Sequence, residues 1–127
     1  MGFRVAVIGW LCVALTGCAS AEPAGKTFTP IQYFKNYAFS TCVADGYQSE
    51  EVTKDAAAAA RGYLELGELP LEAHTQATLL GRQFLSADYK SMSGAKLTLM
   101  KCIDFYHSKA LDQLAHRYAG KNQSGAR

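Results

Sequence analysis

The chain has 127 residues, of which 49% are hydrophobic and 19% are charged. This length and composition fit one globular domain and exclude a disordered or collagen-like chain. The formal net charge is only +2, which argues against a nucleic-acid binder held by a strong basic field. We therefore expect no nucleic acid among the partners of this protein.

The N-terminus has the pattern of an export signal. Residues 1–17 contain one basic side chain, Arg4, followed by an apolar run that is too short to span a bilayer as a mature helix. Residues 15–18 read LTGC and resemble the lipobox of bacterial lipoproteins, in which the cysteine, here Cys18, is acylated and becomes the first residue. The alternative is conventional cleavage at the small residues 19–21 (ASA). Both interpretations predict export.

The residues after the cysteine bear on where the protein is anchored. Ala19 stands where an aspartate would direct retention in the inner membrane. The sequence therefore predicts a lipid anchor in the outer membrane, facing the periplasm, with the lipid on Cys18 as the only membrane contact. Residues 18–28 are mostly small or polar and are predicted to form a flexible tether.

The next part of the chain, residues 29–120, has the spacing of a helical domain. Residues 29–32 (TPIQ) have the pattern of a capping box with proline at the first helical position. The helix that they start is predicted to end at residues 45–46 (DG). A second helix is predicted from Ser49, which is followed by two acids, to the glycine of residues 66–67 (LG).

Two more helices are predicted after the second. One opens at Pro70 and runs to about Tyr89, and the other spans roughly residues 96–118. Between them, residues 90–94 (KSMSG) have the composition of an exposed turn, and residues 121–127 are predicted to be a polar tail that frays. No segment alternates with period two over a strand length. The sequence therefore predicts an all-α, compact bundle of about four main helices with short connections.

Two cysteines fall within the helical domain. Cys42 lies in the apolar stripe of the first predicted helix, and Cys102 lies in that of the last, beside Leu99, Ile103 and Tyr106. In an exported, oxidising setting a disulfide would join the two helices across about 60 residues. Two buried free thiols are the alternative.

The sequence contains no recognisable catalytic or metal-binding set. Asp104 and His107 are three residues apart on one predicted helix, but His116 falls on its polar side and no third ligand has useful spacing. We interpret His107 as packed at the edge of the apolar arc and His116 as solvated. A glycine-rich phosphate loop and a paired-carboxylate motif are also missing. We therefore expect no enzymatic activity, no cofactor and no metal.

Charge and small residues are unevenly distributed. Residues 45–72 hold seven acids and two bases, whereas the chain from Arg82 onward holds eight bases and three acids. Such a dipolar chain could associate with itself or steer a charged partner, or it could present ordinary solvated faces. The small residues of the segment 56–62 would allow another helix to approach closely, either inside the bundle or across a dimer.

Three segments together resemble a known family. They are residues 37–47 (YAFSTCVADGY), 63–67 (YLELG) and 96–106 (KLTLMKCIDFY). In order and spacing they are similar to the immunity proteins of type VI secretion amidase effectors, and most of all to the fourth Tai family, the partners of the fourth Tae amidase family. The likeness covers roughly residues 30–118. It implies a small all-helical homodimer with a structural disulfide.

The resemblance also implies a function. Members of the family neutralise a peptidoglycan amidase, a papain-like cysteine peptidase, in the periplasm, and so protect the cell from self or sibling intoxication. A protruding loop enters the catalytic groove of the enzyme, and by position that loop is the turn at residues 89–96. Small residues at its tip could enter a narrow groove, and a methionine could fill an irregular apolar pocket. The expected partner-binding residues are Tyr89, Lys90, Ser91, Met92, Ser93, Gly94 and Lys96.

Three functions are open at this point. The first is an immunity protein that binds an effector, and the second is an envelope lipoprotein with a structural or assembly role. The third is a periplasmic enzyme, for which no residue constellation is visible. Without the family resemblance, residues 89–96 would be interpreted as a plain interhelix turn. A neighbouring gene for a small papain-like amidase would favour the first function.

Overall fold

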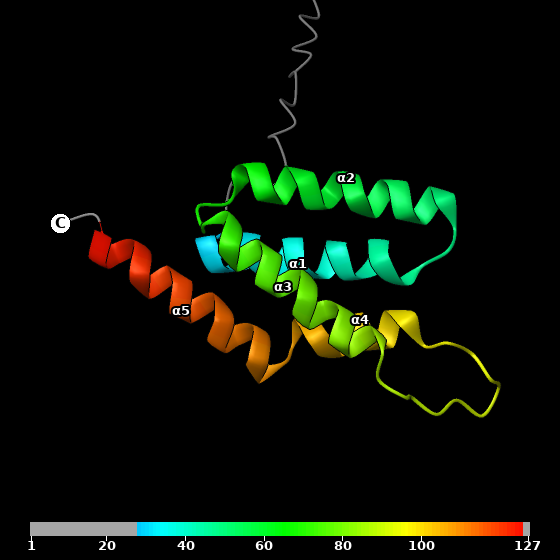
Figure 1. Ribbon diagram of the computed structural model, residues 1–127. Helices are drawn as coiled ribbons and strands as arrows, with labels where there is room; N and C mark the ends of the chain where they lie inside the picture. Colours follow the sequence, from blue (N-terminus) through cyan, green and yellow to red (C-terminus); the bar gives the residue numbers. More distant parts are fainter. Residues whose placement is uncertain (1–27, 126–127) are drawn as a thin grey trace, which may run out of the picture.

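Figure 1 shows the computed structural model of the chain, which describes residues 28–125. The predicted signal segment, Cys18 and the tether up to residue 27 lie outside the described residues. No strand occurs within residues 28–125, so the predicted all-α fold class is confirmed. The helices of this part are α1 (Pro30–Gly46), α2 (Glu50–Leu66), α3 (Leu71–Leu85), α4 (Thr98–Tyr106) and α5 (Lys109–Gly125).

The helix α1 is the centre of the fold, because it contacts each of the other four helices. It begins at the predicted capping box. The Thr29 hydroxyl accepts a hydrogen bond from the Gln32 N–H at 3.2 Å, and the Gln32 side chain accepts one from the Thr29 N–H at 2.9 Å. Both bonds satisfy N–H groups that the first helical turn leaves without a partner.

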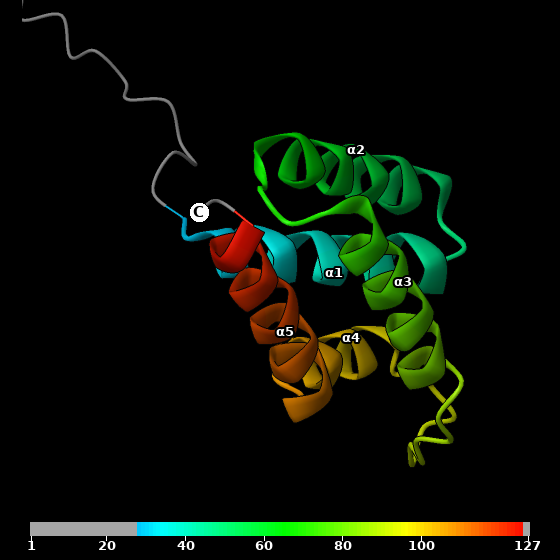
Figure 2. The same ribbon diagram turned by 60° about the vertical axis from the view of Figure 1, so that its left-hand side comes forward.

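The helices α1 and α2 form an antiparallel pair (Figures 1 and 2). Ser49 caps α2 as predicted, and the first turn of α2 carries two acids. Ala56 and Ala60 are the buried residues of α2. Because α2 packs on α1, these two alanines serve the close approach of helices inside the bundle, while Ala59 faces outward.

The helices α3, α4 and α5 cover the rest of α1. Figure 2 shows α3 crossing α1, with α4 and α5 below α1. Their apolar faces meet in one core. The largest fully buried hydrophobic side chains are Phe34 on α1, Phe105 on α4 and Leu111 on α5. The rest of the buried cluster consists of Ala38, Cys42, Leu69, Ala73, Ala77, Cys102, Leu114, Ala115 and Tyr118.

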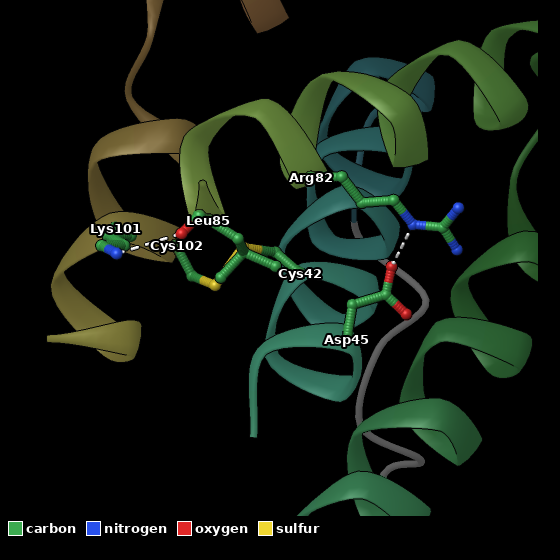
Figure 3. Close-up of a disulfide and its surroundings, with 6 residues drawn as sticks. All are labelled: Cys42, Asp45, Arg82, Leu85, Lys101 and Cys102. Carbon is green, nitrogen blue, oxygen red and sulfur yellow. Dashed lines mark hydrogen bonds and ion pairs between the residues drawn. A yellow bond between two sulfur atoms is a disulfide. The ribbon is translucent and has the colours of Figure 1, made fainter. Parts of the chain in front are cut away.

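The predicted disulfide is present in the core. Cys42 and Cys102 are bonded, with their Cα atoms 5.7 Å apart and their positions separated by 60 in sequence. Cys42 is 2% exposed and Cys102 is 0% exposed. The bond joins α1 to α4 (Figure 3).

The last predicted helix, residues 96–118, is divided in the structure. The helix α4 ends at Tyr106, and the chain turns at residues 107–108 before α5 begins at Lys109. The Ser108 hydroxyl accepts a hydrogen bond from the Leu111 N–H at 3.2 Å, which is the geometry of an N-cap. Apolar periodicity did not reveal the bend, because core residues lie on both sides of it.

Two other helix ends differ from the prediction. The helix α3 ends at Leu85 rather than near Tyr89, so the connection to α4 is longer than the predicted turn. The helix α5 continues to Gly125, so the polar residues 121–125 are helical where the sequence predicted a tail that frays. No helix within residues 28–125 has the length and apolarity that crossing a bilayer requires.

Candidate functional site

The site predicted for a partner lies in the connection between α3 and α4. This connection, residues 86–97, is the longest between helices in the described part of the chain, and it protrudes from the helical body (Figure 1). We call it the α3–α4 loop. It contains all the predicted partner-binding residues, from Tyr89 to Lys96, so the structure brings them together on one protrusion.

Residues 91–94 form the tip of the α3–α4 loop. The Gly94 N–H donates to the Ser91 carbonyl at 3.2 Å, which closes a four-residue turn. The Ser93 N–H donates to the Ser91 hydroxyl at 3.3 Å, and the two serine hydroxyls are 3.0 Å apart. Gly94 has φ +73°, a left-handed conformation that glycine adopts without steric penalty. Met92 is fully exposed, so the tip presents one apolar side chain between two hydroxyls.

The base of the loop contacts α4. The Tyr89 hydroxyl donates to Oδ2 of Asp104 at 2.6 Å. This hydrogen bond, together with loss of solvent and the negative charge of Asp104, raises the pKa of Tyr89. Lys101 Nζ donates to the carbonyl of Leu85, the last residue of α3, at 3.0 Å. Lys90 forms an exposed ion pair with Asp88 inside the loop.

The returning side of the loop borders a hollow. Leu97, which precedes α4, has φ +53°, a strained conformation for a residue with a large side chain. The hollow has a volume of about 430 Å³ and is lined by residues 46–48 and 95–100. It lies where the loop meets the end of α1.

The outward face of α4 is apolar, which was not predicted from the sequence. Leu99, Met100 and Ile103 are 47%, 50% and 43% exposed, whereas Cys102 on the opposite face is buried. The prediction had placed Leu99 and Ile103 in the core stripe beside Cys102. Apolar residues occupy more of this short helix than one buried stripe needs, and that excess was the available signal.

The histidines are arranged differently from the prediction. His107 was expected to be packed, but it is exposed because α4 ends just before it and places it in the turn to α5. His116 is exposed as expected. The buried histidine is His74, whose Nδ1 is 3.0 Å from the carbonyl of Pro70.

His74 lies between aromatic rings in the core. Its ring centroid is 5.3 Å from that of Phe34 and 4.6 Å from that of Tyr37. Burial lowers its pKa, against the smaller opposing effect of the bond to Pro70. Within residues 28–125, no three His, Cys, Asp or Glu residues come together as metal ligands.

The acidic and basic parts of the chain meet near the start of the α3–α4 loop. Arg82 Nε, in the last turn of α3, donates to Oδ2 of Asp45 at the end of α1, at 2.9 Å (Figure 3). The uneven charge along the sequence is therefore partly compensated inside the fold. The ion pair also attaches the end of α3 to α1.

The described residues therefore form a disulfide-bonded helical scaffold from which the α3–α4 loop protrudes. Residues 32–115 match the family model described as Tai4, the type VI secretion system (T6SS) amidase immunity protein. The chain therefore belongs to this family of type VI secretion amidase immunity proteins. The family resemblance expected for residues 30–118 is confirmed.

Solved structures of effector–immunity systems have the same fold. The Tae4/Tai4 system from Salmonella typhimurium contains a chain that is 30% identical, with a TM-score of 0.72, covering 76% of this chain and 96% of that one. The Tae4–Tai4 complex from Enterobacter cloacae contains one that is 25% identical, with a TM-score of 0.67 and coverages of 76% and 98%.

A third similar structure supports the fold alone. It comes from work on type VI-secreted toxins and self-resistance proteins of Serratia marcescens, and its chain is 23% identical with a TM-score of 0.67, covering 79% of this chain and 87% of that one. Among curated proteins, no sequence is similar enough to count as a match.

Proposed function

We propose that this protein is a periplasmic immunity protein that binds and inhibits a peptidoglycan amidase effector of the fourth Tae family, a papain-like cysteine peptidase. Family membership supports the class of function. The similar chains from S. typhimurium and E. cloacae belong to Tae4/Tai4 effector–immunity systems, which supports an amidase of that family as the cognate partner.

We infer that inhibition works by inserting the α3–α4 loop into the catalytic groove of the amidase. The observation that carries this proposal is the tip, where a fully exposed Met92 stands between two serines on a protrusion from the helical body. Small residues can pass a narrow groove, and the flexible thioether side chain can fill an irregular apolar pocket. A few central contacts of this kind supply most of the energy of a typical interface.

The test is the inhibition, by the mature protein, of a fourth-family Tae amidase encoded by a neighbouring gene, measured as cleavage within the peptide stems of peptidoglycan. The triple replacement Ser91→Arg, Met92→Glu and Ser93→Arg should weaken inhibition at least tenfold, about 1.4 kcal/mol. The matched control, Ala57→Arg, Ala58→Glu and Ala59→Arg, changes three exposed residues of α2 by the same chemistry and should leave inhibition unchanged. Both variants should keep the wild-type helical circular-dichroism signal.

Two results would contradict parts of this proposal. Inhibition that survives the tip replacement would move the contact surface to a helix face, with the acidic α2 as the first candidate. If the wild-type protein does not inhibit the amidase encoded beside its own gene, the proposed immunity function is rejected and the alternative, an envelope lipoprotein with a structural or assembly role, is favoured.

We also propose that Cys18 carries the lipid that anchors the protein to the outer membrane. The described chain starts at Phe28, which packs edge-on against Tyr33 with ring centroids 5.5 Å apart. This start lies at the opposite end of the molecule from the α3–α4 loop (Figures 1 and 2), so an anchored domain would present the loop away from the membrane. Cys18→Ser should abolish palmitate labelling, and a wild-type protein that takes up no label would favour conventional cleavage at residues 19–21.

We propose, finally, that the mature protein is a homodimer, as the family resemblance implies. Exposed leucines on α3 are compatible with a second copy, because Leu71 and Leu79 are 70% and 54% exposed. Light scattering after size-exclusion chromatography should give twice the mass of one chain. A single-chain mass across a hundredfold range of concentration would contradict dimerisation.

A further inference from the structure

The base of the α3–α4 loop is attached to one turn of α4 by two side chains. Lys101 and Asp104 are three residues apart on α4 and therefore point to the same side of the helix. Asp104 accepts the hydrogen bond of the Tyr89 hydroxyl at 2.6 Å, and Lys101 donates to the Leu85 carbonyl at 3.0 Å. The Lys101 ammonium also lies 5.6 Å from the centroid of the Tyr89 ring.

These contacts lie at two successive points of the chain, one at the end of α3 and one within the loop. Leu85 is the last residue of α3, and its carbonyl is one of those that a helix end leaves without an intrahelical partner. A lysine at this place also interacts favourably with the negative end of the helix dipole. Tyr89 is the second point, three residues before Met92. The chain is therefore held where it leaves α3 and again shortly before the tip.

The turn of α4 that carries both side chains is fixed to the core. Cys102, between Lys101 and Asp104 in sequence, is bonded to Cys42 of α1, and Phe105 is fully buried. Figure 3 shows the hydrogen bond from Lys101 to Leu85 next to the disulfide. The tip has a different kind of support, because its hydrogen bonds run among residues 91–94.

We propose that Tyr89, Lys101 and Asp104 form a clamp that sets the direction of the α3–α4 loop before a partner binds. The expected consequence of the clamp is tighter binding, and this part rests on the proposed function. A loop that is already held in position loses less conformational entropy in the complex. The three residues are positioning residues. They act on the tip through the backbone of the loop.

The clamp should affect the loop without affecting global stability. The Tyr89–Asp104 hydrogen bond is exposed, and water competes for exposed polar pairs, so such pairs contribute little to the free energy of unfolding. A loop held by few contacts opens locally without unfolding the core. Amide hydrogen exchange in the free mature protein measures this opening, and it requires no partner.

The test uses Tyr89→Phe, Asp104→Ala, the double variant and Asp104→Asn, whose amide oxygen can still accept the hydrogen bond. Exchange of residues 87–96 should be at least threefold faster in Tyr89→Phe and Asp104→Ala, and close to wild type in Asp104→Asn. Their thermal midpoints should stay at the wild-type value. Asp88→Asn is the matched control, since it removes a charge of the loop that is paired with Lys90 and not with α4.

Affinity for a fourth-family Tae amidase is the second measurement. Each single variant should bind roughly three- to tenfold more weakly, and the double variant no more weakly than either single one, because both substitutions remove the same hydrogen bond. Losses that multiply in the double variant would indicate two independent contacts with the amidase and would overturn the clamp.

Two other results would also overturn the proposal. One is unchanged exchange in both single variants. The other is faster exchange in the single variants together with unchanged affinity for the amidase, when the tip replacement does weaken binding. Failure of the tip replacement itself would count against the proposed function, and the exchange measurement on the free protein would still decide whether the clamp holds the loop.

Discussion

The helical core and the α3–α4 loop are stabilised by different interactions. The core surrounds the Cys42–Cys102 disulfide. The core joins α1, α3, α4 and α5 through fully buried side chains such as Phe34 and Phe105 and one covalent bond. The loop ends in an exposed tip with hydrogen bonds between neighbouring residues, and a few polar side chains attach its base.

Because of this difference, we expect different residues to determine the free energy of unfolding and the binding of a partner. Burial of apolar surface stabilises the core, so substitutions there should change the free energy of unfolding. The tip buries little, so substitutions there should change what the protein binds while leaving it folded.

Removing the disulfide should have the largest effect on the core. Replacing Cys42 and Cys102 together by alanine should lower the free energy of unfolding by about 4 kcal/mol, because the bond closes a loop of 60 residues in the unfolded chain. Denaturant titration of the mature protein measures this loss. Reductant should destabilise the wild type by a similar amount and leave the double variant unchanged, and a loss below about 1 kcal/mol would contradict the role given to the bond.

Acid should weaken the core through His74. The Pro70 carbonyl can only accept, so Nδ1 carries the proton, and buried Nε2 has no hydrogen-bond partner in the described part of the chain. Since burial lowers the pKa of His74 below its ordinary 6.5, the unfolded chain takes up a proton more readily than the folded one. Stability should therefore be full above pH 6.5 and fall as the pH drops, by at most about 1.4 kcal/mol per pH unit.

The control for this prediction is His74→Gln, which removes the titrating ring. Unfolding free energies of both proteins between about pH 5 and pH 8 should differ by a constant amount at the upper end and converge toward the lower end. If the two free energies of unfolding differ by the same amount at every pH, the pKa of His74 is not changed by folding and the prediction is wrong.

The same substitution at two glycines should have opposite signs in the loop and in a helix. Gly94→Ala places a side chain in a left-handed conformation of φ +73° and should cost about 1 kcal/mol. Gly62→Ala, inside α2 with nothing within 4 Å of the added carbon, should stabilise the protein by about 0.5–1 kcal/mol. Thermal and denaturant midpoints of the two variants provide the measurement. If both substitutions stabilised the protein, or both destabilised it, backbone conformation would not be what decides the effect.

The tip itself should have the smallest effect on stability. Met92→Ala removes a fully exposed side chain and should change the free energy of unfolding by less than about 0.5 kcal/mol. The same variant should weaken inhibition of the amidase at least threefold. A stability loss of a core-like size, about 2 kcal/mol or more, would show that Met92 packs against the body of the protein.

Local signals in the sequence were sufficient for most of the fold. The capping box at residues 29–32 acts through its own neighbours, and Ser49 caps α2 in the same local way. The disulfide could also be predicted, since only two cysteines remain in the domain after export and each lies on an apolar stripe. The two caps depend little on the tertiary packing of the chain, whereas the disulfide was predictable because the domain offers no other pairing of cysteines.

Features set by tertiary packing were not predicted. The end of α3 at Leu85 coincides with the bond from Lys101, a residue 16 positions away. The turn at residues 107–108 interrupts an apolar pattern that continues on both sides. The exposure of Leu99 depends on which face of α4 the disulfide turns inward.

The candidate site was located in sequence only in part. The composition of residues 90–94 predicted an exposed turn, but its role came from the resemblance to a family. The residues that hold the base of the loop, Lys101 and Asp104, lie on the next helix. No spacing rule connects them to Tyr89, so their contribution became visible only in the structure.

The α3–α4 loop is the surface through which we propose that this protein binds its amidase. Amide hydrogen exchange of the mature protein, compared with and without a fourth-family Tae amidase, tests it most directly. The strongest protection should fall within residues 86–97, with no change at the exposed residues 57–59 of α2. Protection concentrated on a helix face, with residues 86–97 exchanging as fast as in the free protein, would contradict it.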